Sequence, residues 1–353
     1  MHIARRLTAG LAFACLAVAT SFAQQAPPAP PAAQLPKVLL LGTGGTISNR
    51  AGGRLTVDEL IKSIPNLDRL VRAEGEQFAN VSSGEITLDQ WLDLSRRIND
   101  RYKKDGELAG VVVTSGTDTL EELAYFLHLT VRDSRPVVVV GSMRNPSTLG
   151  YEGAANLEDA FRVAADPASR DMGVLVVLND EINSAREATK TDARLLNTFT
   201  SRDYGVLGTV LDRVAYSRKP VKRHTAASEF DVTKITSLPR VDVILSYQGA
   251  PGDLIQAAVD AGAKGIVVAG AGAGAMSGSQ SQAASYAVSK GAFVVTTTRT
   301  GGGTVGGGGT GRGGPTGRAS GDDLQPVKAR ILLMLALATT SDSNEVRRMF
   351  REY

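Results

Sequence analysis

Seven short runs of β-branched and aliphatic residues recur along the chain, and segments with helical spacing lie between them. Strands that alternate with helices are typical of a parallel sheet whose faces are covered by helices. We therefore predict an α/β fold. The predicted strands are 38–41, 110–114, 137–140, 173–178, 241–245, 265–269 and 292–296.

Capping boxes mark the starts of three predicted helices. In such a box, a threonine and an acid or amide three residues later satisfy each other's backbone donors. The segment 326–339 also has helical spacing, with Lys328 and Arg330 at its flank, and we interpret it as a packing helix. The capping pairs are Thr56 with Glu59, Thr87 with Gln90, and Thr119 with Glu122.

The periodicity fades between Arg213 and Arg240, where lysine, arginine, serine and proline accumulate. We predict a linker at 226–239 that divides an N-terminal domain, 37–225, from a C-terminal domain, 240–353. The glycine-rich run 301–314 is interpreted as a flexible surface loop, and an anion-binding nest is the alternative.

The first 23 residues are ordered like an export signal. A basic start precedes a mostly apolar stretch at 7–20, and a small-x-small cleavage site ends at Ala23. We predict cleavage after Ala23 and a periplasmic or secreted product that begins with a disordered lead at 24–36. The only cysteine, Cys15, lies in the apolar stretch; we interpret it as filler, with a lipid anchor as the alternative.

Charge and cysteine content narrow the function classes. The formal charge of +3 falls to +1 once Arg5 and Arg6 leave with the signal. So small an excess gives no reason to expect a nucleic acid or a membrane surface as a partner. The mature chain has no cysteine, which excludes disulfides, a thiolate nucleophile and thiolate metal sites.

Histidine chemistry is scarce as well. His128 and His224 lie away from any nucleophile-elbow motif, which disfavours a Ser-His-Asp hydrolase. We expect His128, within a helical pattern, to be satisfied or partly exposed. Paired zinc ligands and the lysine of a phosphate loop are also absent from the sequence. The run GAGAGA at 270–275 matches a dinucleotide fingerprint weakly, so nucleotide binding stays open as an alternative.

Two hydroxyl-rich turns remain. The stretch LLLGTGGTISNR leaves one predicted strand through glycine and carries Thr46, and TSGTDT leaves another and carries Thr117 and Asp118. Loops at the carboxyl ends of neighbouring parallel strands converge on one crevice, so these side chains face a shared space if the two strands are neighbours. Glycine lets the backbone approach a small ligand, and backbone amides can stabilise an oxyanion. Asp118, at a predicted helix start, suits a ligand that carries an α-ammonium group.

A threonine nucleophile needs a base, and a desolvated lysine in a cationic setting can be that base. Lys190, in EATKTD, follows the predicted strand 173–178 and its loop, and it is the candidate. Ordinary interpretations stay open for each residue: Thr46 as a turn hydroxyl, Asp118 as a helix N-cap, and Lys190 as a solvated surface charge.

Taken together, these motifs carry a family resemblance. GTGGTIS, TSGTDTLEE and REATKT closely resemble the bacterial type II L-asparaginases and the related glutaminase-asparaginases. The likeness covers nearly all of the mature chain, including VVVVGSMR, RDYGVLG and PVKARILLMLAL. It implies a larger N-terminal parallel-sheet domain, a smaller C-terminal α/β domain and a homotetramer built as a dimer of dimers. It also implies hydrolysis of L-asparagine, with L-glutamine as a second amide, and no metal or organic cofactor.

The resemblance also implies roles for single residues. Thr46 would be the nucleophile that forms an acyl-enzyme, and Thr117, Asp118 and Lys190 the second catalytic set. Asp118 would also take the α-ammonium group of the substrate, and Ser83 its α-carboxylate. The implied substrate-binding residues are Ser83, Gly45, Gly84, Gly116, Thr117, Asp118 and Ser142.

Several positions depart from the family pattern. The family's lid carries a tyrosine, whereas the thirteen residues between Thr46 and Leu60 contain none and hold Arg50 and Arg54. The alternative function is therefore a catalytically weak amide-binding homologue that lacks the lid tyrosine. The other departures are Ser115 for a histidine, Gly84 for a ligand-contacting glutamine, and Gly249 and the run 301–314 for an asparagine and a glutamate that a neighbouring subunit offers.

Overall fold

The computed structural model describes residues 34–306 and 316–353. The predicted signal at 1–23, with its cleavage site and Cys15, lies outside the described residues. So do 24–33 of the predicted lead and 307–314 of the glycine-rich run.

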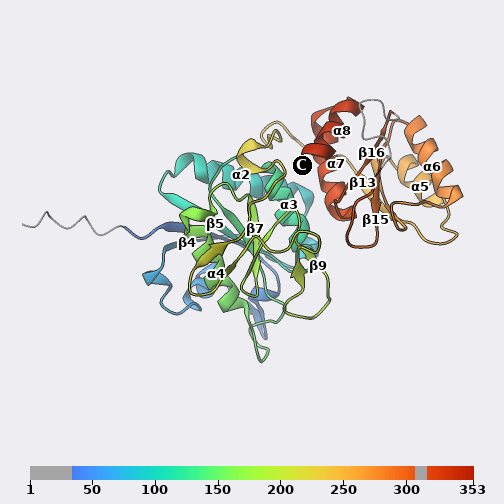
Figure 1. Ribbon diagram of the computed structural model, residues 1–353. Helices are drawn as coiled ribbons and strands as arrows, with labels where there is room; N and C mark the ends of the chain where they lie inside the picture. The colour runs from blue at the N-terminus through green and yellow to red at the C-terminus, as the bar shows by residue number, and fades with distance from the viewer. Residues whose placement is uncertain (1–33, 307–315) are drawn as a thin grey trace, which may run out of the picture. The chain divides into compact units, whose positions relative to one another are not determined.

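An eight-stranded sheet forms the N-terminal part of the described chain (Figure 1). Its strand order is β12-β11-β8-β7-β6-β5-β1-β4; the strands from β4 to β7 in this order are parallel, and β8, β11 and β12 continue it antiparallel. The strands are β1 Lys37–Gly44, β4 Arg72–Val81, β5 Leu108–Thr114, β6 Val137–Val140, β7 Val174–Leu178, β8 Glu181–Ser184, β11 Gly208–Val210 and β12 Val214–Tyr216.

A second, four-stranded parallel sheet forms the C-terminal part, in the order β13-β14-β15-β16. Two small antiparallel hairpins, β2–β3 and β9–β10, complete the strands. All seven predicted strands form, so the predicted α/β class with a larger and a smaller parallel-rich sheet is confirmed. The bounds are β2 Asn49–Arg50, β3 Gly53–Arg54, β9 Thr189–Lys190, β10 Phe199–Thr200, β13 Val241–Leu245, β14 Gly265–Gly270, β15 Phe293–Thr298 and β16 Arg318–Ser320.

Helices cover both faces of the large sheet, and alternate residues of each strand face different helices. Leu39 and Leu41 of β1 pack in one apolar cluster with residues of α2 and α3, whereas Val38 and Leu40 pack with residues of α1 and α4. This period of two explains why the central strands are apolar at nearly every position. The helices are α1 Val57–Lys62, α2 Leu88–Lys104, α3 Leu120–Thr130, α4 Gly153–Ala165, α5 Asp253–Asp260, α6 Gly278–Ser289, α7 Pro326–Thr339 and α8 Ser343–Glu352.

Two of the three predicted capping boxes are confirmed. Thr56 caps α1 and Thr87 caps α2, both from extended backbone with ψ near 165° and 162°. The box at Thr119 is wrong, because its ψ of 16° leaves the extended region that an N-cap side chain needs, and its hydroxyl does not cap α3. The Glu122 carboxylate lies 3.7 Å from the Arg330 guanidinium instead. The predicted packing helix 326–339 is confirmed as α7.

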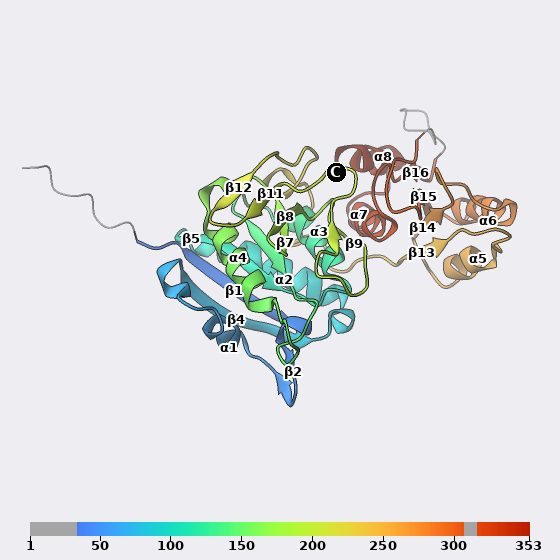
Figure 2. The ribbon, with the colours of Figure 1, turned by 60° about the horizontal axis from the view of Figure 1, so that its bottom comes forward.

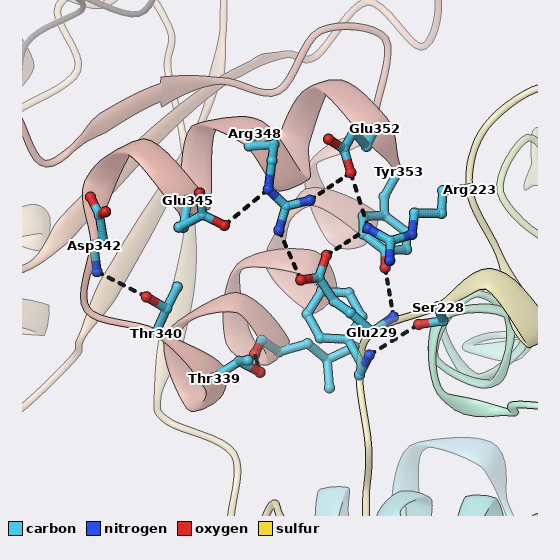
Figure 3. Close-up of polar contacts among 12 residues, drawn as sticks. Arg223, Ser228, Glu229, Thr339, Thr340, Asp342, Glu345, Arg348, Glu352 and Tyr353 are labelled. Carbon is cyan, nitrogen blue, oxygen red and sulfur yellow. Dashed lines mark hydrogen bonds and ion pairs between the residues drawn. The ribbon is translucent and has the colours of Figure 1, made fainter.

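The predicted linker region is irregular but well connected. Glu229, within it, accepts from Arg223 at 3.0 Å and from Arg348 of α8 at 2.8 Å, and its N–H donates to the Tyr353 hydroxyl at 2.8 Å. Figure 3 shows this network, in which Glu352 also accepts from Arg223 and Arg348. The segment is therefore tied to the last helix of the chain by charge-assisted hydrogen bonds. No helix of the described residues has both the length and the apolar character to cross a bilayer.

The expectation that His128 is satisfied or partly exposed is confirmed at one ring nitrogen only. Its side chain is fully buried in α3, and its Nδ1 accepts the backbone N–H of Val174 at 3.1 Å. Its Nε2 has no hydrogen-bond partner among the described residues. The ring lies 5.0 Å from the ring of His224. The apolar periodicity of the helix places this ring inside, because every residue of α3 around it is buried as well.

Candidate active site

The two hydroxyl-rich turns leave neighbouring strands, as the sequence required. β1 pairs with both β5 and β4, all three parallel, so their carboxyl ends lie at one edge of the sheet (Figure 2). Thr43, the last strand residue but one, ties β1 to β5: its hydroxyl donates to the Thr114 carbonyl at 2.6 Å, and its N–H donates to the Thr114 hydroxyl at 3.1 Å. The first threonine of GTGGT is thus structural.

The chain leaves β1 through two glycines with positive φ. Gly44 has a φ of 104° and Gly45 a φ of 89°, a backbone region that favours glycine. A Cβ at Gly45 would overlap the backbone of Gly116, so the two turns touch. Thr46 follows directly and opens a short 3-10 turn, η1 Thr46–Ser48.

The Thr46 hydroxyl is left unengaged by this turn. Its side chain is half-buried, and in 34–306 and 316–353 it has no hydrogen-bond partner. The carbonyl of the next residue, Ile47, accepts from the Tyr151 hydroxyl at 2.9 Å. Burial raises the pKa of Tyr151 to about 12, so this hydroxyl remains a donor across the neutral range. The backbone next to Thr46 is therefore fixed by a hydrogen bond, whereas the Thr46 hydroxyl is available to react.

Ser83 approaches from the neighbouring strand. It follows β4 in the short turn η3 Ser83–Glu85, and it is buried. A Cβ at Gly116 would lie 2.9 Å from the Ser83 hydroxyl, so Ser83 borders the same point at which the two turns meet. Gly84 beside it faces open space, since no atom lies within 4 Å of where its Cβ would stand.

Lys190 brings an amine to the second motif. Its Nζ donates to the Thr117 hydroxyl at 3.0 Å and to the Asp118 carboxylate at 2.8 Å. The Lys190 side chain is 15% exposed and that of Asp118 is 86% exposed, so the carboxylate borders solvent. The expected cationic setting of Lys190 is wrong: the charged group that it bonds is anionic, because the β9–β10 hairpin aims the amine at the turn before α3.

The remaining predicted residues border the site or lie apart from it. Ser142 follows β6, is buried, and donates its hydroxyl to the Arg144 carbonyl at 2.6 Å, so that hydroxyl is already engaged. Gly141 before it backs onto Ser115 and Thr117. Gly249 lies in an exposed turn after β13, at a φ of 73°.

Two side chains that the sequence analysis did not place at the site, Glu121 and Lys328, lie close to the Lys190 segment. Glu121, in the first turn of α3, accepts from the Lys190 N–H at 3.2 Å and from the Thr189 hydroxyl at 2.9 Å. Lys328 of α7 is fully buried and lies 3.9 Å from the Glu121 carboxylate. The sequence signal that could have identified Lys328 is its position near the start of a mostly apolar helix, where a lysine is unusual.

The site can supply acyl-transfer chemistry from its own side chains. It combines a free threonine hydroxyl, a hydroxyl–amine pair and a carboxylate around glycine backbone, which are the elements of nucleophilic catalysis with proton transfer. Among the described residues, no group of three or more histidines, cysteines and carboxylates is arranged to hold a metal ion.

Known proteins resemble the chain over nearly its whole described length. A family model described as "Asparaginase, N-terminal" matches residues 37–222, and one described as "Glutaminase/Asparaginase C-terminal domain" matches residues 240–350. L-asparaginase 2 of Bacillus subtilis is 41% identical over 329 residues, covering 90% of this chain and 87% of the relative.

Two further relatives differ in the location that their names give. The probable periplasmic L-asparaginase of Haemophilus influenzae is 37% identical over 332 residues, covering 91% of this chain and 94% of the relative. The solved structure of a probable cytoplasmic L-asparaginase from Campylobacter jejuni is similar with a TM-score of 0.86 at 38% identity, covering 90% of this chain and 100% of that chain.

Proposed function

The chain belongs to the asparaginase family of enzymes, and we propose that it hydrolyses L-asparagine to L-aspartate and ammonia through a threonine acyl-enzyme. L-glutamine is proposed as a second amide. The observation that supports this most is the contact of Lys190 Nζ with Thr117 at 3.0 Å, at a turn that touches the turn of Thr46.

In the proposed first step, the Thr46 hydroxyl attacks the side-chain amide carbon. Its proton passes by way of Thr117 and Lys190 and returns to the amide nitrogen, which departs as ammonia and leaves an ester on Thr46. Water then attacks the ester, giving its proton to the same pair, and aspartate leaves with Thr46 restored. Backbone N–H groups of the glycine turns would stabilise the oxyanion in both steps.

The ends of the substrate have matching partners in this proposal. Asp118 would bind the α-ammonium group, since its exposed carboxylate borders the site. Ser83 would bind the α-carboxylate, and Gly45, Gly84, Gly116 and Ser142 would line the space around the ligand. No metal or organic cofactor takes part.

Ammonia release from purified protein tests the proposal. Asparagine, and glutamine as the second amide, should be turned over well above a Thr46→Ala control. The alternative is a catalytically weak amide-binding homologue that lacks the lid tyrosine. It predicts thermal stabilisation by aspartate, by mass action, with no turnover above the control.

We further propose that the protein is exported and assembles as a homotetramer. The basic and apolar start of the sequence supports export, and the name of the Haemophilus influenzae relative agrees. Exposed apolar side chains at Val243, Leu245, Tyr247 and Leu254 give the C-terminal part a surface that an assembly would cover. Cell fractionation checks the location, and light scattering of the purified protein checks the mass.

A further inference from the structure

The segment that leads into Lys190 is anchored at successive residues. The Arg186 guanidinium donates to both Asp323 oxygens at 2.6 and 2.7 Å and to the Tyr353 main-chain oxygen at 2.8 Å. Glu187 pairs with Arg218. The side chains of this segment are thus committed to neighbours before the chain reaches β9, and its backbone carbonyls need donors of their own.

Lys328 supplies those donors. Its Nζ donates to the carbonyl of Arg186 at 3.0 Å and to the carbonyl of Ala188. The side chain is fully buried on α7, which packs against α3 (Figure 2). A buried ammonium group costs free energy unless its N–H groups are hydrogen-bonded and its charge is balanced. A fully buried lysine on a mostly apolar helix therefore indicates a specific role.

The charge of Lys328 is balanced by Glu121, which holds the same segment from the other side. The Glu121 carboxylate lies 3.9 Å from Nζ and accepts from the Thr189 hydroxyl and the Lys190 N–H. Glu121 lies four residues after Thr117 on the chain that enters α3. One ammonium and one carboxylate therefore fix the backbone of residues 186–190 relative to the turn that Lys190 must reach.

We propose that Lys328 is a positioning residue for catalysis: it holds the 186–190 backbone so that the Lys190 amine meets Thr117 and Asp118. The catalytic half of this inference rests on the proposed function, whereas the positioning half does not. Without Lys328, two carbonyls lose their donor, and the Glu121 carboxylate, which is 13% exposed, loses the ammonium that balances its charge. The 186–190 backbone would then be held less firmly, and the Lys190 amine would be less well placed at Thr117 and Asp118.

The protonated form of Lys328 balances the charge of Glu121 and donates to the two carbonyls, so kcat should depend on whether Lys328 is protonated. Burial, the dominant effect, lowers the pKa of Lys328 to about 8, against the opposing attraction of Glu121, Glu187 and Asp323; Arg186 lowers it further. As the pH rises through about 8, Lys328 loses its charge and kcat should fall.

Lys328→Met and Arg330→Met form a matched pair for the test. Arg330 is the other cation near the start of α7, and it pairs with Glu122 at 3.7 Å and donates to the Val241 carbonyl, away from the Lys190 segment. Hydrogen exchange should show faster amide exchange in peptides that cover 184–191 for Lys328→Met and not for Arg330→Met. Unchanged protection there, or an equal loss throughout the chain in both variants, would overturn the proposal.

Kinetics test the catalytic half. With asparagine as the substrate, Lys328→Met should lower kcat at least tenfold and leave KM within about threefold of the wild-type value. It should also abolish the fall of kcat above pH 8. Arg330→Met should keep the wild-type kcat and the wild-type fall of kcat above pH 8. A wild-type level of kcat in Lys328→Met would refute the inference. If the wild type itself releases no ammonia, the proposed function fails and the exchange result alone decides the positioning of Lys190. If Lys328→Met does not fold, Lys328→Gln is compared with Arg330→Met in the same exchange and kinetic measurements, and the pH dependence of kcat is measured on the wild type.

Discussion

At the scale of single residues, the Lys190 amine is the group whose removal should separate chemistry from binding. Lys190→Met should lower kcat by about a hundredfold or more, the usual size of a general acid–base contribution, and change KM little. Lys37→Met is the matched control, since Lys37 is a lysine of similar exposure, 19%, that pairs with Glu74 and Asp105 outside the site. Steady-state ammonia assays measure both. A rise in KM alone for Lys190→Met would mean that Lys190 only holds the substrate.

The residues of the candidate site that lie within short sequence motifs could be predicted from the sequence. Thr46, Thr117 and Asp118 follow glycine-rich strand ends, and the parallel strand order that brings such ends together is itself readable from the sequence. Glu121 was not recognised, because acidic residues are common in the first turn of a helix and so give no specific signal of a site. Lys328 was not recognised either, because its partners lie about 140 residues away in the chain, at the carbonyls of Arg186 and Ala188.

At the scale of elements, the hairpin β2–β3 lies where the family's lid was expected, and it is fixed to its surroundings. The Leu55 N–H donates to the Ser48 carbonyl at 2.7 Å, and Asn80 contacts both residues through its side chain. The Ala51 N–H at its tip donates to the Ser147 hydroxyl at 2.8 Å. Two of these partners, Asn80 and Ser147, lie outside the hairpin, so the hairpin is fixed to its surroundings without a tyrosine of its own.

Arg54 at the end of this hairpin should contribute to substrate recognition. Its guanidinium makes two long contacts, to the Gly45 carbonyl at 3.4 Å and to the Ser82 hydroxyl at 3.5 Å, and it has no ion pair within 4 Å in the described part of the chain. Arg54→Ala should lower kcat/KM for asparagine about tenfold to a hundredfold, because a hydrogen bond from Arg54 to the α-carboxylate of the substrate would contribute about 1.5–3 kcal/mol.

Two comparisons isolate that effect. The reaction of 3-aminopropanamide, which is asparagine without its α-carboxylate, should be unaffected by Arg54→Ala. Arg50→Ala, on the same hairpin but paired with exposed Glu59 at 3.0 Å, should leave both substrates unaffected. An equal loss on the two amides would show that Arg54 only supports the hairpin.

The accuracy of the strand predictions follows β propensity. The predicted strand 137–140 matches β6, whose four valines are both β-prone and buried. The predicted strand 241–245 matches β13 although Val243 and Leu245 are exposed, because its valines and isoleucine are β-prone. β4 was missed because it is an edge strand of its sheet and reads RAEGEQFANV, which has no apolar run. Its Glu74 and Glu76 pair with Arg101 and Arg97 of α2, and such pairs cannot be recognised from periodicity. The two-residue strands of the hairpins are too short for any periodicity, and tertiary hydrogen bonds alone define them.

At the scale of the whole molecule, the neighbouring rings of buried His128 and half-buried His224 should make stability fall in mild acid. Burial lowers the pKa of both rings, that of His128 well below its usual 6.5, with the charge of His224 as its second cause. A depressed folded pKa means that the unfolded chain binds the proton first. The contribution of His128 is therefore complete above pH 6.5 and is lost as the pH falls from there toward the folded pKa.

His128→Asn isolates this effect, since an amide oxygen can accept the Val174 N–H in place of Nδ1 without titrating. Between pH 7.5 and 5.5, the wild type should lose about 1.4 kcal/mol of unfolding free energy more than the variant does. Asp159, whose pKa is raised to about 7 by burial and by Asp180, titrates in the same window with the opposite sign, but it does so in both proteins and cancels in the difference. Urea unfolding at one fixed protein concentration measures it, because assembly would make stability depend on concentration. A difference that stays constant with pH would mean that His128 accepts a proton in the folded protein as readily as in the unfolded chain.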